Sequence, residues 1–389
     1  MRIAIDGTML CAPDGSRGAG IEHYSWSITT ALLQTGESHE FFVSTPPGLS
    51  RIRRQELLEA GAHVTLLPSW GPKLSFVSRH AILPMRFLLR RPDVLFSPFG
   101  QIPLGWRGKS VVTVHDLAIY EHPEWFPSQQ SFATRVVVPN SLKRATQIIA
   151  VSSATQKKLH EFVSSTVGRV HVVFEGVDLN EAYATLSQVD STSTRFPFDR
   201  EFVLFLGTIE PRKNLLNAFR AFHAFLQSRP EQAAQVRFIV AGKKGWHTRE
   251  AEEECVTINH AWKDVEPTGV IQFLGPVTEE EKWNLLARAS CLLYPSWDEG
   301  FGLPLLEAMA VGTPVIASNR GALPEVGGDA AVYVDPEDIE AMSFALTQCL
   351  LIPEGVREIR ELGIQRAAEF SWERAAQETM KILEEVAQS

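Results

Sequence analysis

Short runs of apolar residues, rich in valine and isoleucine, alternate along the chain with longer segments in which apolar residues recur every three or four positions. The longer segments have the period of helices that bury one face, and the short continuous runs are typical of strands buried on both faces. This alternation predicts parallel sheets covered by helices on both sides. The predicted strands are Val94–Ser97, Val111–Val114, Ile148–Val151 and Val170–Phe174 in the first half, and Val203–Gly207, Val236–Ala241, Val270–Leu274, Cys291–Pro295 and Pro314–Ser318 in the second. The clearest predicted helices are Ile21–Leu33, Leu215–Leu226 and Glu279–Arg288.

The pattern is interrupted once, between about Asn180 and Arg200, where the polar stretch Asp190-Ser-Thr-Ser-Thr-Arg195 has no periodicity. Such a stretch is typical of a linker. A chain of 389 residues is long enough for two domains of ordinary size. We therefore expect a first Rossmann-like domain over residues 1–185 and a second over residues 190–370. Ser371 is placed to cap a last helix, over residues 371–389, that starts at Trp372.

Composition and charge narrow the class of protein. A hydrophobic fraction of 44% suits a globular protein, and a net charge of −9 argues against nucleic acid as a partner. Cys11, Cys255, Cys291 and Cys349 lack Cys-x-x-Cys spacing, which argues against a metal or redox site. The first residues read as a strand and not as a signal peptide, and no run of about 18 apolar residues predicts a membrane-spanning helix. We expect a cytoplasmic protein, either free or bound peripherally to the cytoplasmic face of the membrane.

The strongest motif follows the predicted strand at Cys291 and reads Glu299-Gly-Phe-Gly-Leu-Pro-Leu-Leu-Glu307. The glycines form a turn that opens a helix, and backbone N–H groups at a helix N-terminus bind phosphate or sugar oxygens well. Glu299 lies at the turn and Glu307 lies within the helix, and each carboxylate can accept hydrogen bonds from paired sugar hydroxyls.

Other candidate residues also follow predicted strands, where ligands bind in open parallel sheets. Gly207 and Thr208 end one strand, and Arg212 and Lys213 come shortly after it. His115 follows a strand of the first half, with Asp116 beside it.

A glycine-rich loop precedes the first predicted helix, at Ile21. Gly18 and Gly20 could bring backbone N–H groups to a diphosphate or to an acceptor. No Asp-x-Asp sequence occurs, so the usual carboxylate pair that holds a metal ion on a nucleotide-sugar is absent. We therefore expect no metal and no cofactor.

Taken together, these segments resemble glycosyltransferase family four, a group of retaining enzymes with the GT-B fold. The resemblance spans nearly the whole chain. It is carried by the Glu-x7-Glu string of Glu299 and Glu307 and by the segments Val114-His-Asp-Leu117, Ile149-Ala-Val-Ser-Ser153, Val172-Val-Phe-Glu-Gly-Val-Asp178, Phe205-Leu-Gly-Thr-Ile-Glu-Pro-Arg-Lys-Asn214 and Gly321-Ala-Leu-Pro-Glu-Val326. The resemblance implies two Rossmann-like domains that face a central cleft, with the C-terminal helix crossing back to the first domain.

The resemblance also implies roles for individual residues. Glu307 would bind the ribose hydroxyls of the donor nucleotide, and Glu299 would contact the transferred sugar. Backbone groups of Phe301, Gly302 and Leu303 would line the donor site.

Three further side chains would interact with the donor diphosphate and the reaction centre. Lys213 would neutralise the diphosphate. The family often has arginine where this chain has Thr208, so Arg212 is the expected substitute. His115 would reach the transferred sugar and the reaction centre.

The implied activity is metal-independent transfer of a hexose, with mannose from GDP-mannose as the first choice, from a nucleotide-sugar donor to a saccharide or lipid-linked acceptor. Two alternatives stay open: a protein of the same fold that binds nucleotide or carbohydrate without transfer, and another sugar-nucleotide enzyme such as an epimerase.

A basic and apolar segment, residues 79–91, suggests a contact with the membrane. Arg79, Arg86 and Arg90 would lie on one helical face, and the apolar surface would come from Ile82, Phe87, Leu88 and Leu89. The alternative is a helix packed on the first sheet with its arginines in solvent.

Overall fold

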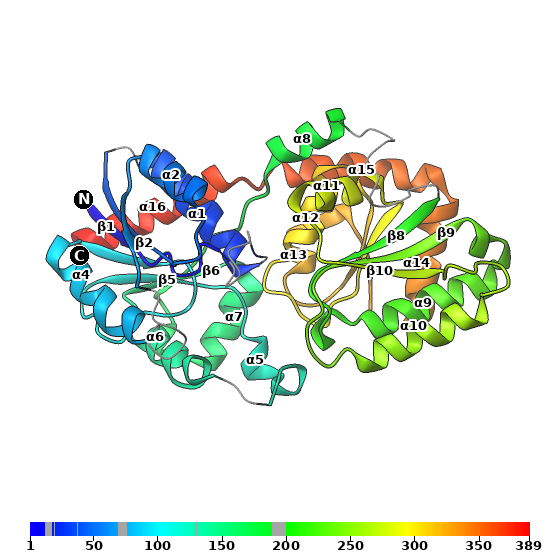
Figure 1. Cartoon of the computed structure of the whole chain (residues 1–389), viewed down its shortest axis with the longest axis horizontal. Helices are drawn as coiled ribbons and strands as arrows, with labels where there is room; N and C mark the ends of the chain where they lie inside the picture. Colours follow the sequence, from blue (N-terminus) through cyan, green and yellow to red (C-terminus); the bar gives the residue numbers. More distant parts are fainter. Residues whose placement is uncertain (12–17, 19, 37, 69–75, 129–130, 189–199) are drawn as a thin grey trace. The chain divides into compact units, whose positions relative to one another are not determined.

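A computed structural model of the protein describes residues 1–11, 18, 20–36, 38–68, 76–128, 131–188 and 200–389 (Figure 1). The chain forms two compact units. Unit 1 comprises Met1–Leu117, Gln129–Gly176 and Ser371–Ser389, and unit 2 comprises Ala118–Ser128 and Val177–Phe370. Each unit is an α/β layer structure around a parallel sheet, so the predicted fold class of two Rossmann-like domains is confirmed.

The sheet of unit 1 has the described strand order β3-β2-β1-β4-β5-β6-β7, and all neighbours are parallel. The order reverses between β1 and β4, because both β2 and β4 pair with β1. The carboxyl ends of β1 and β4 therefore flank the place where such a sheet binds ligands. The strands are β1 (Arg2–Ile5), β2 (Glu40–Thr45), β3 (His63–Leu66), β4 (Val94–Ser97), β5 (Ser110–Val114), β6 (Gln147–Ala150) and β7 (Val170–Val172).

Helices cover both faces of this sheet (Figure 1). The C-terminal helix α16 packs along α1 and over β4, β5 and β6. Ser371 caps α16 by accepting a hydrogen bond from the N–H of Arg374, as the sequence predicts. The helices of this unit are α1 (Ile21–Thr35), α2 (Arg51–Glu59), α4 (Leu83–Arg90), α6 (Val138–Arg144), α7 (Ser153–Phe162) and α16 (Trp372–Gln388).

The sheet of unit 2 has the order β10-β9-β8-β11-β12-β13 and is also parallel. Here the order reverses between β8 and β11. The apolar core includes Phe219, Phe222 and Phe225 of α9, packed on β8 and β9. The strands are β8 (Glu201–Leu206), β9 (Val236–Ala241), β10 (Ile271–Gly275), β11 (Cys291–Tyr294), β12 (Val315–Ser318) and β13 (Val332–Val334).

In this unit α9, α10 and α14 lie on one side of the sheet, and α11, α12 and α15 lie on the other (Figure 1). The helices are α5 (Ala118–Glu121), α8 (Leu179–Gln188), α9 (Leu215–Ser228), α10 (Arg249–Ala261), α11 (Glu279–Arg288), α12 (Leu303–Ala310), α13 (Leu323–Gly327), α14 (Ile339–Leu351) and α15 (Pro353–Ala367). Among the residues that the structure describes, no helix is both long and apolar enough to cross a bilayer.

The division of the chain differs in two places from the expected domains 1–185 and 190–370. Part of the expected linker is helix α8, which belongs to unit 2 because the Nε1 of Trp283 donates to Glu181 over 3.0 Å. The rest of that linker, residues 189–199, lies outside the described residues. Residues 118–128 also belong to unit 2, where the carbonyl of Trp125 accepts a 2.7 Å hydrogen bond from Trp246.

Candidate active site

A cluster of ionisable side chains in unit 2 lies where β8 and β11 end. These neighbouring strands flank the reversal of strand order, which in open parallel sheets leaves room for a ligand beyond the carboxyl ends. Arg212 and Lys213 follow β8, and Glu299 follows β11. The fold therefore brings together residues that lie 86 and 87 positions apart in the sequence.

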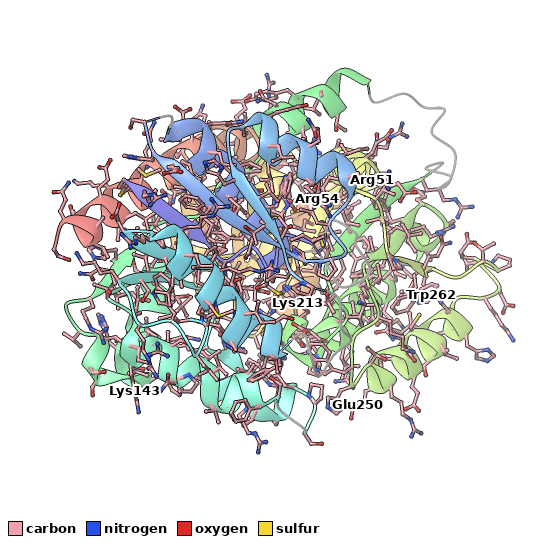
Figure 2. All side chains as sticks on the ribbon, turned by 60° about the vertical axis from the view of Figure 1, so that its left-hand side comes forward. Arg51, Arg54, Lys143, Lys213, Glu250 and Trp262 are labelled. Atoms are coloured by element: carbon pink, nitrogen blue, oxygen red, sulfur yellow. The ribbon has the colours of Figure 1, made fainter. Side chains whose placement is uncertain are left out.

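Glu299 is held between two cations. Lys213 Nζ donates to Glu299 Oε1 over 2.6 Å, and Arg212 Nη1 donates to Glu299 Oε2 over 2.7 Å. Arg212 is fixed in turn by the carboxylate of Glu210 and by the carbonyl of Asp298, each at 3.0 Å. Lys213 is labelled in Figure 2. Because both oxygens of this buried carboxylate receive a charged donor, the cluster is rigid and strongly polar.

Burial and charge act in opposite directions on these groups. Burial alone would raise the pKa of Glu299, but the charges of Arg212 and Lys213 outweigh burial and lower the pKa to about 2. Burial lowers the pKa of Lys213, and the charge of Glu299 offsets only part of that effect. Burial and the charge of Glu299 raise the pKa of Tyr294, whose hydroxyl accepts a 2.8 Å hydrogen bond from Lys213. Glu299 is therefore ionised and Tyr294 protonated at neutral pH.

Glycines bring the backbone close to this cluster. Gly302 has φ 104° and stands directly before α12, whose first N–H groups have no partner within the helix. A Cβ at Gly321 would lie 2.7 Å from the backbone N and O of Glu299, and only glycine avoids that clash. The predicted donor-binding residues occupy this turn and the end of β8: Phe301 is buried, Leu303 begins α12, Gly207 has φ 146°, and Thr208 is half-buried beside it.

Glu307 lies in α12 and is buried, so it does not lie on a solvated helix face. Its Oε1 accepts a 2.5 Å hydrogen bond from Lys282 of α11. Lys282 also forms an ion pair with Glu279. The charges of both glutamates outweigh burial and raise the pKa of Lys282. Sequence reasoning missed Lys282, because a lysine that follows Glu279-Glu-Glu281 reads as part of a solvated helix face.

His115 of unit 1 follows β5 and is held on both ring nitrogens. Nδ1 lies 3.1 Å from Glu175 Oε1, and Nε2 lies 2.9 Å from the carbonyl of Pro98. The ring of Tyr24 packs edge-on at 4.5 Å. Both polar partners are acceptors, so the two nitrogens donate together only in the imidazolium form. Burial lowers the pKa of His115, but the hydrogen bond and charge of Glu175 outweigh burial and raise it.

Glu175 was also missed from the sequence, although its segment Val172–Asp178 carries part of the family resemblance. No signal in a single sequence links it to a histidine 60 positions earlier.

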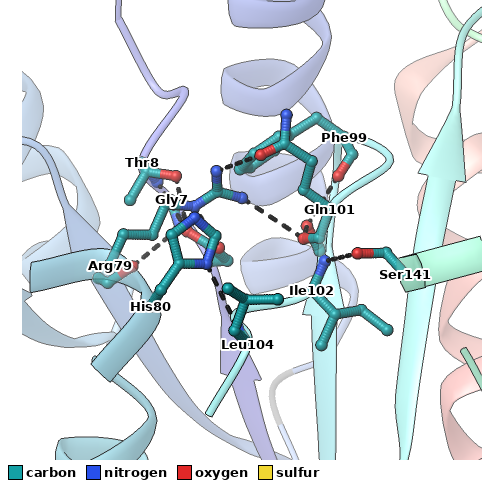
Figure 3. A network of polar contacts seen from close by, with 12 residues as sticks. Gly7, Thr8, Arg79, His80, Phe99, Gln101, Ile102, Leu104 and Ser141 are labelled. Atoms are coloured by element: carbon teal, nitrogen blue, oxygen red, sulfur yellow. Dashed lines mark hydrogen bonds and ion pairs between the residues drawn. The ribbon is translucent and has the colours of Figure 1, made fainter. Parts of the chain in front are cut away.

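A second polar network lies at the ends of β1 and β4 in unit 1 (Figure 3). Arg79 Nε donates to the fully buried Asp6 over 3.3 Å, and its Nη1 donates to Gln101 over 2.5 Å. Asp6 also accepts from the hydroxyl of Thr8 at 2.8 Å. Burial and the charge of Arg79 lower the pKa of the adjacent His80 to about 4, so this histidine is neutral at physiological pH.

The expectation that Arg79, Arg86 and Arg90 share one helical face is wrong. The extra residue of the π-helical turn Ser78–Ile82 breaks the spacing before α4, and Arg79 points to Asp6. Arg86 donates to the carbonyl of Leu66 over 2.9 Å, and the guanidinium of Arg90 lies 5.8 Å from the ring centre of Phe42. Of the expected apolar surface, Phe87 is buried, whereas Leu88 and Leu89 are 55% and 80% exposed; Met85 is exposed as well, at 60%.

Gly18 and Gly20 both have left-handed backbone, with φ 73° and 59°. Gly20 directly precedes α1, and its carbonyl accepts the N–H of Tyr24. Most of the glycine-rich loop, residues 12–17 and 19, lies outside the described residues. The proposed contact of this loop with phosphate or acceptor stays a prediction.

The sequence matches two families of domains. Residues 18–181 match Glycosyltransferase Family 4, and residues 188–366 match Glycosyl transferases group 1. The chain is 31% identical over 279 residues to O-antigen chain mannosyltransferase B of Escherichia coli, which covers 70% of this chain and 69% of that protein. It is 23% identical to O-antigen chain mannosyltransferase RfbU of Salmonella typhimurium over 88% of this chain and 90% of that protein.

Solved structures share the fold of this chain. Sucrose-phosphate synthase from Thermosynechococcus elongatus superposes with a TM-score of 0.72 over 100% of both chains at 20% identity. HepE from Anabaena, in complex with UDP and glucose, superposes with a TM-score of 0.73 over 99% of this chain and 100% of that chain at 18% identity. Both are GT-B glycosyltransferases. These similarities are consistent with the two parallel sheets and with the cluster around Glu299. The chain belongs to the family 4 glycosyltransferases with the GT-B fold.

Proposed function

We propose that this glycosyltransferase moves mannose from GDP-mannose to a hydroxyl of a saccharide or lipid-linked saccharide, with retention of configuration and without a metal ion. The choice of mannose is supported by the O-antigen mannosyltransferases that the chain resembles. The choice of a nucleotide-sugar donor is supported by the ionic cluster at the strand reversal of unit 2.

The observation that carries the proposal is the position of Arg212 and Lys213 beside Glu299 and close to the turn that opens α12. Cleavage of the bond between the anomeric carbon and the diphosphate puts growing negative charge on the leaving oxygens. Fixed cations and helix N-terminal N–H groups that face those oxygens lower the barrier. These groups supply the charge that a metal ion would otherwise supply.

Retention is best served by attack of the acceptor hydroxyl on the face that the diphosphate leaves. The bond from the anomeric carbon to the acceptor oxygen forms as the bond to the phosphate oxygen breaks, and the leaving phosphate takes the acceptor proton. This route needs no protein nucleophile. Glu299 is compatible with a route that uses no protein nucleophile. A carboxylate with a pKa of about 2 and a charged donor on each oxygen is a weak nucleophile. We assign Glu299 to orienting the sugar and His115 to supplying fixed positive charge.

A lipid-linked acceptor would place unit 1 at a membrane surface. Met85, Leu88 and Leu89 of α4 form an exposed apolar face, with Arg90 and Arg91 at the end of the same helix. Apolar side chains next to basic ones are suited to the boundary of an anionic bilayer.

The nucleotide is tested by thermal unfolding in the presence of UDP, GDP, ADP and dTDP, because a ligand that binds the native state raises the melting temperature. We expect GDP to give the largest shift. Turnover of GDP-mannose, with and without saccharide acceptors, then separates transfer from the alternatives of nucleotide binding alone or epimerisation. Stabilisation by GDP without release of GDP from GDP-mannose in any acceptor mixture would overturn the transfer activity.

A further inference from the structure

We propose that Lys282 is a positioning residue of the donor site, which holds the carboxylate of Glu307 in place to accept hydrogen bonds from the ribose hydroxyls of the nucleotide. The inference rests on the proposed function, since it takes Glu307 as the ribose-binding group. It adds a residue that the family motif does not contain and ties it to one part of the substrate, the ribose of a nucleoside diphosphate.

The contact between the two side chains is short and buried. Lys282 Nζ lies 2.5 Å from Glu307 Oε1, and the two side chains are only 13% and 9% exposed. A buried carboxylate is costly unless it is paired and hydrogen-bonded. Removal of Lys282 would therefore take from Glu307 the charged donor at its Oε1 and weaken the hold on this carboxylate.

The position of the ammonium group is itself fixed by its surroundings. Thr278 and Glu281 form a capping box at the start of α11. Thr278 lies about one turn before Lys282, and Glu281 directly precedes it. The next residue, Trp283, is tied to Glu181 of α8 through its indole nitrogen, 3.0 Å from the carboxylate. Lys282 Nζ also lies 4.6 Å from the centre of the Trp283 ring and pairs with Glu279. An anchored cation of this kind can orient the carboxylate that it contacts.

The place of Glu307 on its helix connects this pair with the donor site. Glu307 lies four residues after Leu303, so the two side chains share one face of α12, next to the turn that carries Glu299. A carboxylate accepts from two adjacent hydroxyls at once, and the 2′ and 3′ hydroxyls of ribose form such a pair. Lys282 can contribute to nucleotide recognition in this way without contacting the nucleotide.

The test compares ribose with deoxyribose. GDP, UDP and ADP, each together with its 2′-deoxy form, are titrated into the wild type and into Lys282→Met. The comparison uses the pair of ribonucleotide and deoxynucleotide that binds most tightly. For the wild type we expect a preference for ribose of roughly tenfold or more, as for a hydrogen bond to a charged group. In Lys282→Met the affinity for the ribonucleotide should fall by about the same factor, roughly tenfold or more. The affinity for the deoxynucleotide should fall by less than about twofold.

Two variants separate positioning from a general structural effect. Lys282→Arg should restore most of the ribose preference, because it keeps the charge. Glu253→Gln, which removes the carboxylate from the exposed pair Arg249–Glu253, should leave the preference unchanged. If Lys282→Met does not fold, as judged by circular dichroism and thermal unfolding, Lys282→Gln takes its place.

The inference is overturned if the Lys282 variants keep the ribose preference, or if they lose affinity equally for both nucleotides. Glu307→Gln shows which proposal has failed. If Glu307→Gln abolishes the ribose preference and Lys282→Met does not, only the role of Lys282 falls. If Glu307→Gln also keeps the preference, or if none of the nucleotides binds, the proposed donor site is wrong.

Discussion

The substitution Glu175→Gln tests whether His115 is held as a cation. In the wild type both ring nitrogens face acceptors, and the carboxylate of Glu175 lies 3.1 Å from Nδ1. Glutamine has nearly the same shape and can still accept a hydrogen bond, but it carries no charge. The variant therefore removes the electrostatic support of the imidazolium and leaves the packing around Tyr24 in place.

The expected size of the effect follows from the contact. A hydrogen bond to a charged group contributes about 1.5–3 kcal/mol, so replacing the Glu175 carboxylate by an amide should lower the pKa of His115 measurably. Burial, the largest single influence on this ring, lowers the pKa and is then opposed only by weaker contacts. We therefore expect the pKa of His115 to fall from its raised value in the wild type.

The same change alters how stability depends on pH. In the wild type the pKa of His115 is higher in the folded protein than in the unfolded chain. Its contribution to stability is therefore complete below about pH 6.5 and is lost as the pH rises through the folded-state pKa. In the variant the folded-state pKa should be lower than in the wild type, so this contribution to stability should be smaller and lost at a lower pH. The two slopes differ by at most about 1.4 kcal/mol per pH unit.

The pKa of His115 is measured by NMR titration of the histidine ring signals, with His115→Asn used to assign the resonance. The slope of unfolding free energy against pH is measured by urea unfolding between pH 5.5 and 8. Glu124→Gln is the matched control, because it removes the carboxylate from the exposed pair His122–Glu124, where the side chains are 45% and 64% exposed. That change should leave the slope as it is. A His115 resonance that titrates identically in the wild type and in Glu175→Gln would refute the reasoning.

Four further outcomes are expected. Glu307→Ala should weaken nucleotide binding by roughly tenfold or more with an unchanged circular dichroism spectrum, because a charged acceptor of the ribose is lost; unchanged affinity by calorimetry would remove Glu307 from the site. His115→Ala should lower kcat by roughly 100-fold while the nucleotide Kd changes less than about threefold, since fixed charge acts in the transition state; equal effects on both would indicate a structural histidine. Turnover should survive excess EDTA, and a loss that Mg²⁺ or Mn²⁺ restores would contradict metal independence. Arg90→Ser combined with Arg91→Ser should reduce sedimentation with anionic vesicles at low salt and leave the weak binding to neutral vesicles unchanged; failure of the wild type to sediment with anionic vesicles would exclude a membrane contact through α4.

The sequence predicted what depends on local pattern and missed what depends on distant contacts. Most of the central strands were found because they are continuous apolar runs. β2 was missed although it is buried between β1 and β3, and β3 and β13 were missed as short edge strands with partly exposed residues. The cluster of Glu299 was predictable because its members each follow a strand. Glu175 and Lys282 were not, since their partners come from other elements and both read as ordinary surface charges.

The other errors have local physical causes. Helix α8 was taken for linker because its polar sequence hides the contact of Glu181 with Trp283. Arg79 was placed on a solvated face because a π-helical turn is invisible in a pattern built on 3.6 residues.

The docking of α16 in unit 1 has a consequence for synthesis on the ribosome. The first 176 residues supply most of unit 1, but α16 comes from the last 19 residues. This helix packs on α1, and the ring centres of its Trp372 and of Tyr24 lie 5.7 Å apart. At ordinary elongation rates the whole of unit 2 separates these events by roughly ten to forty seconds. During that interval the face of α1 that α16 will cover is open to solvent and to chaperones. Unit 2 can therefore complete its fold before unit 1, although its main segment is translated later.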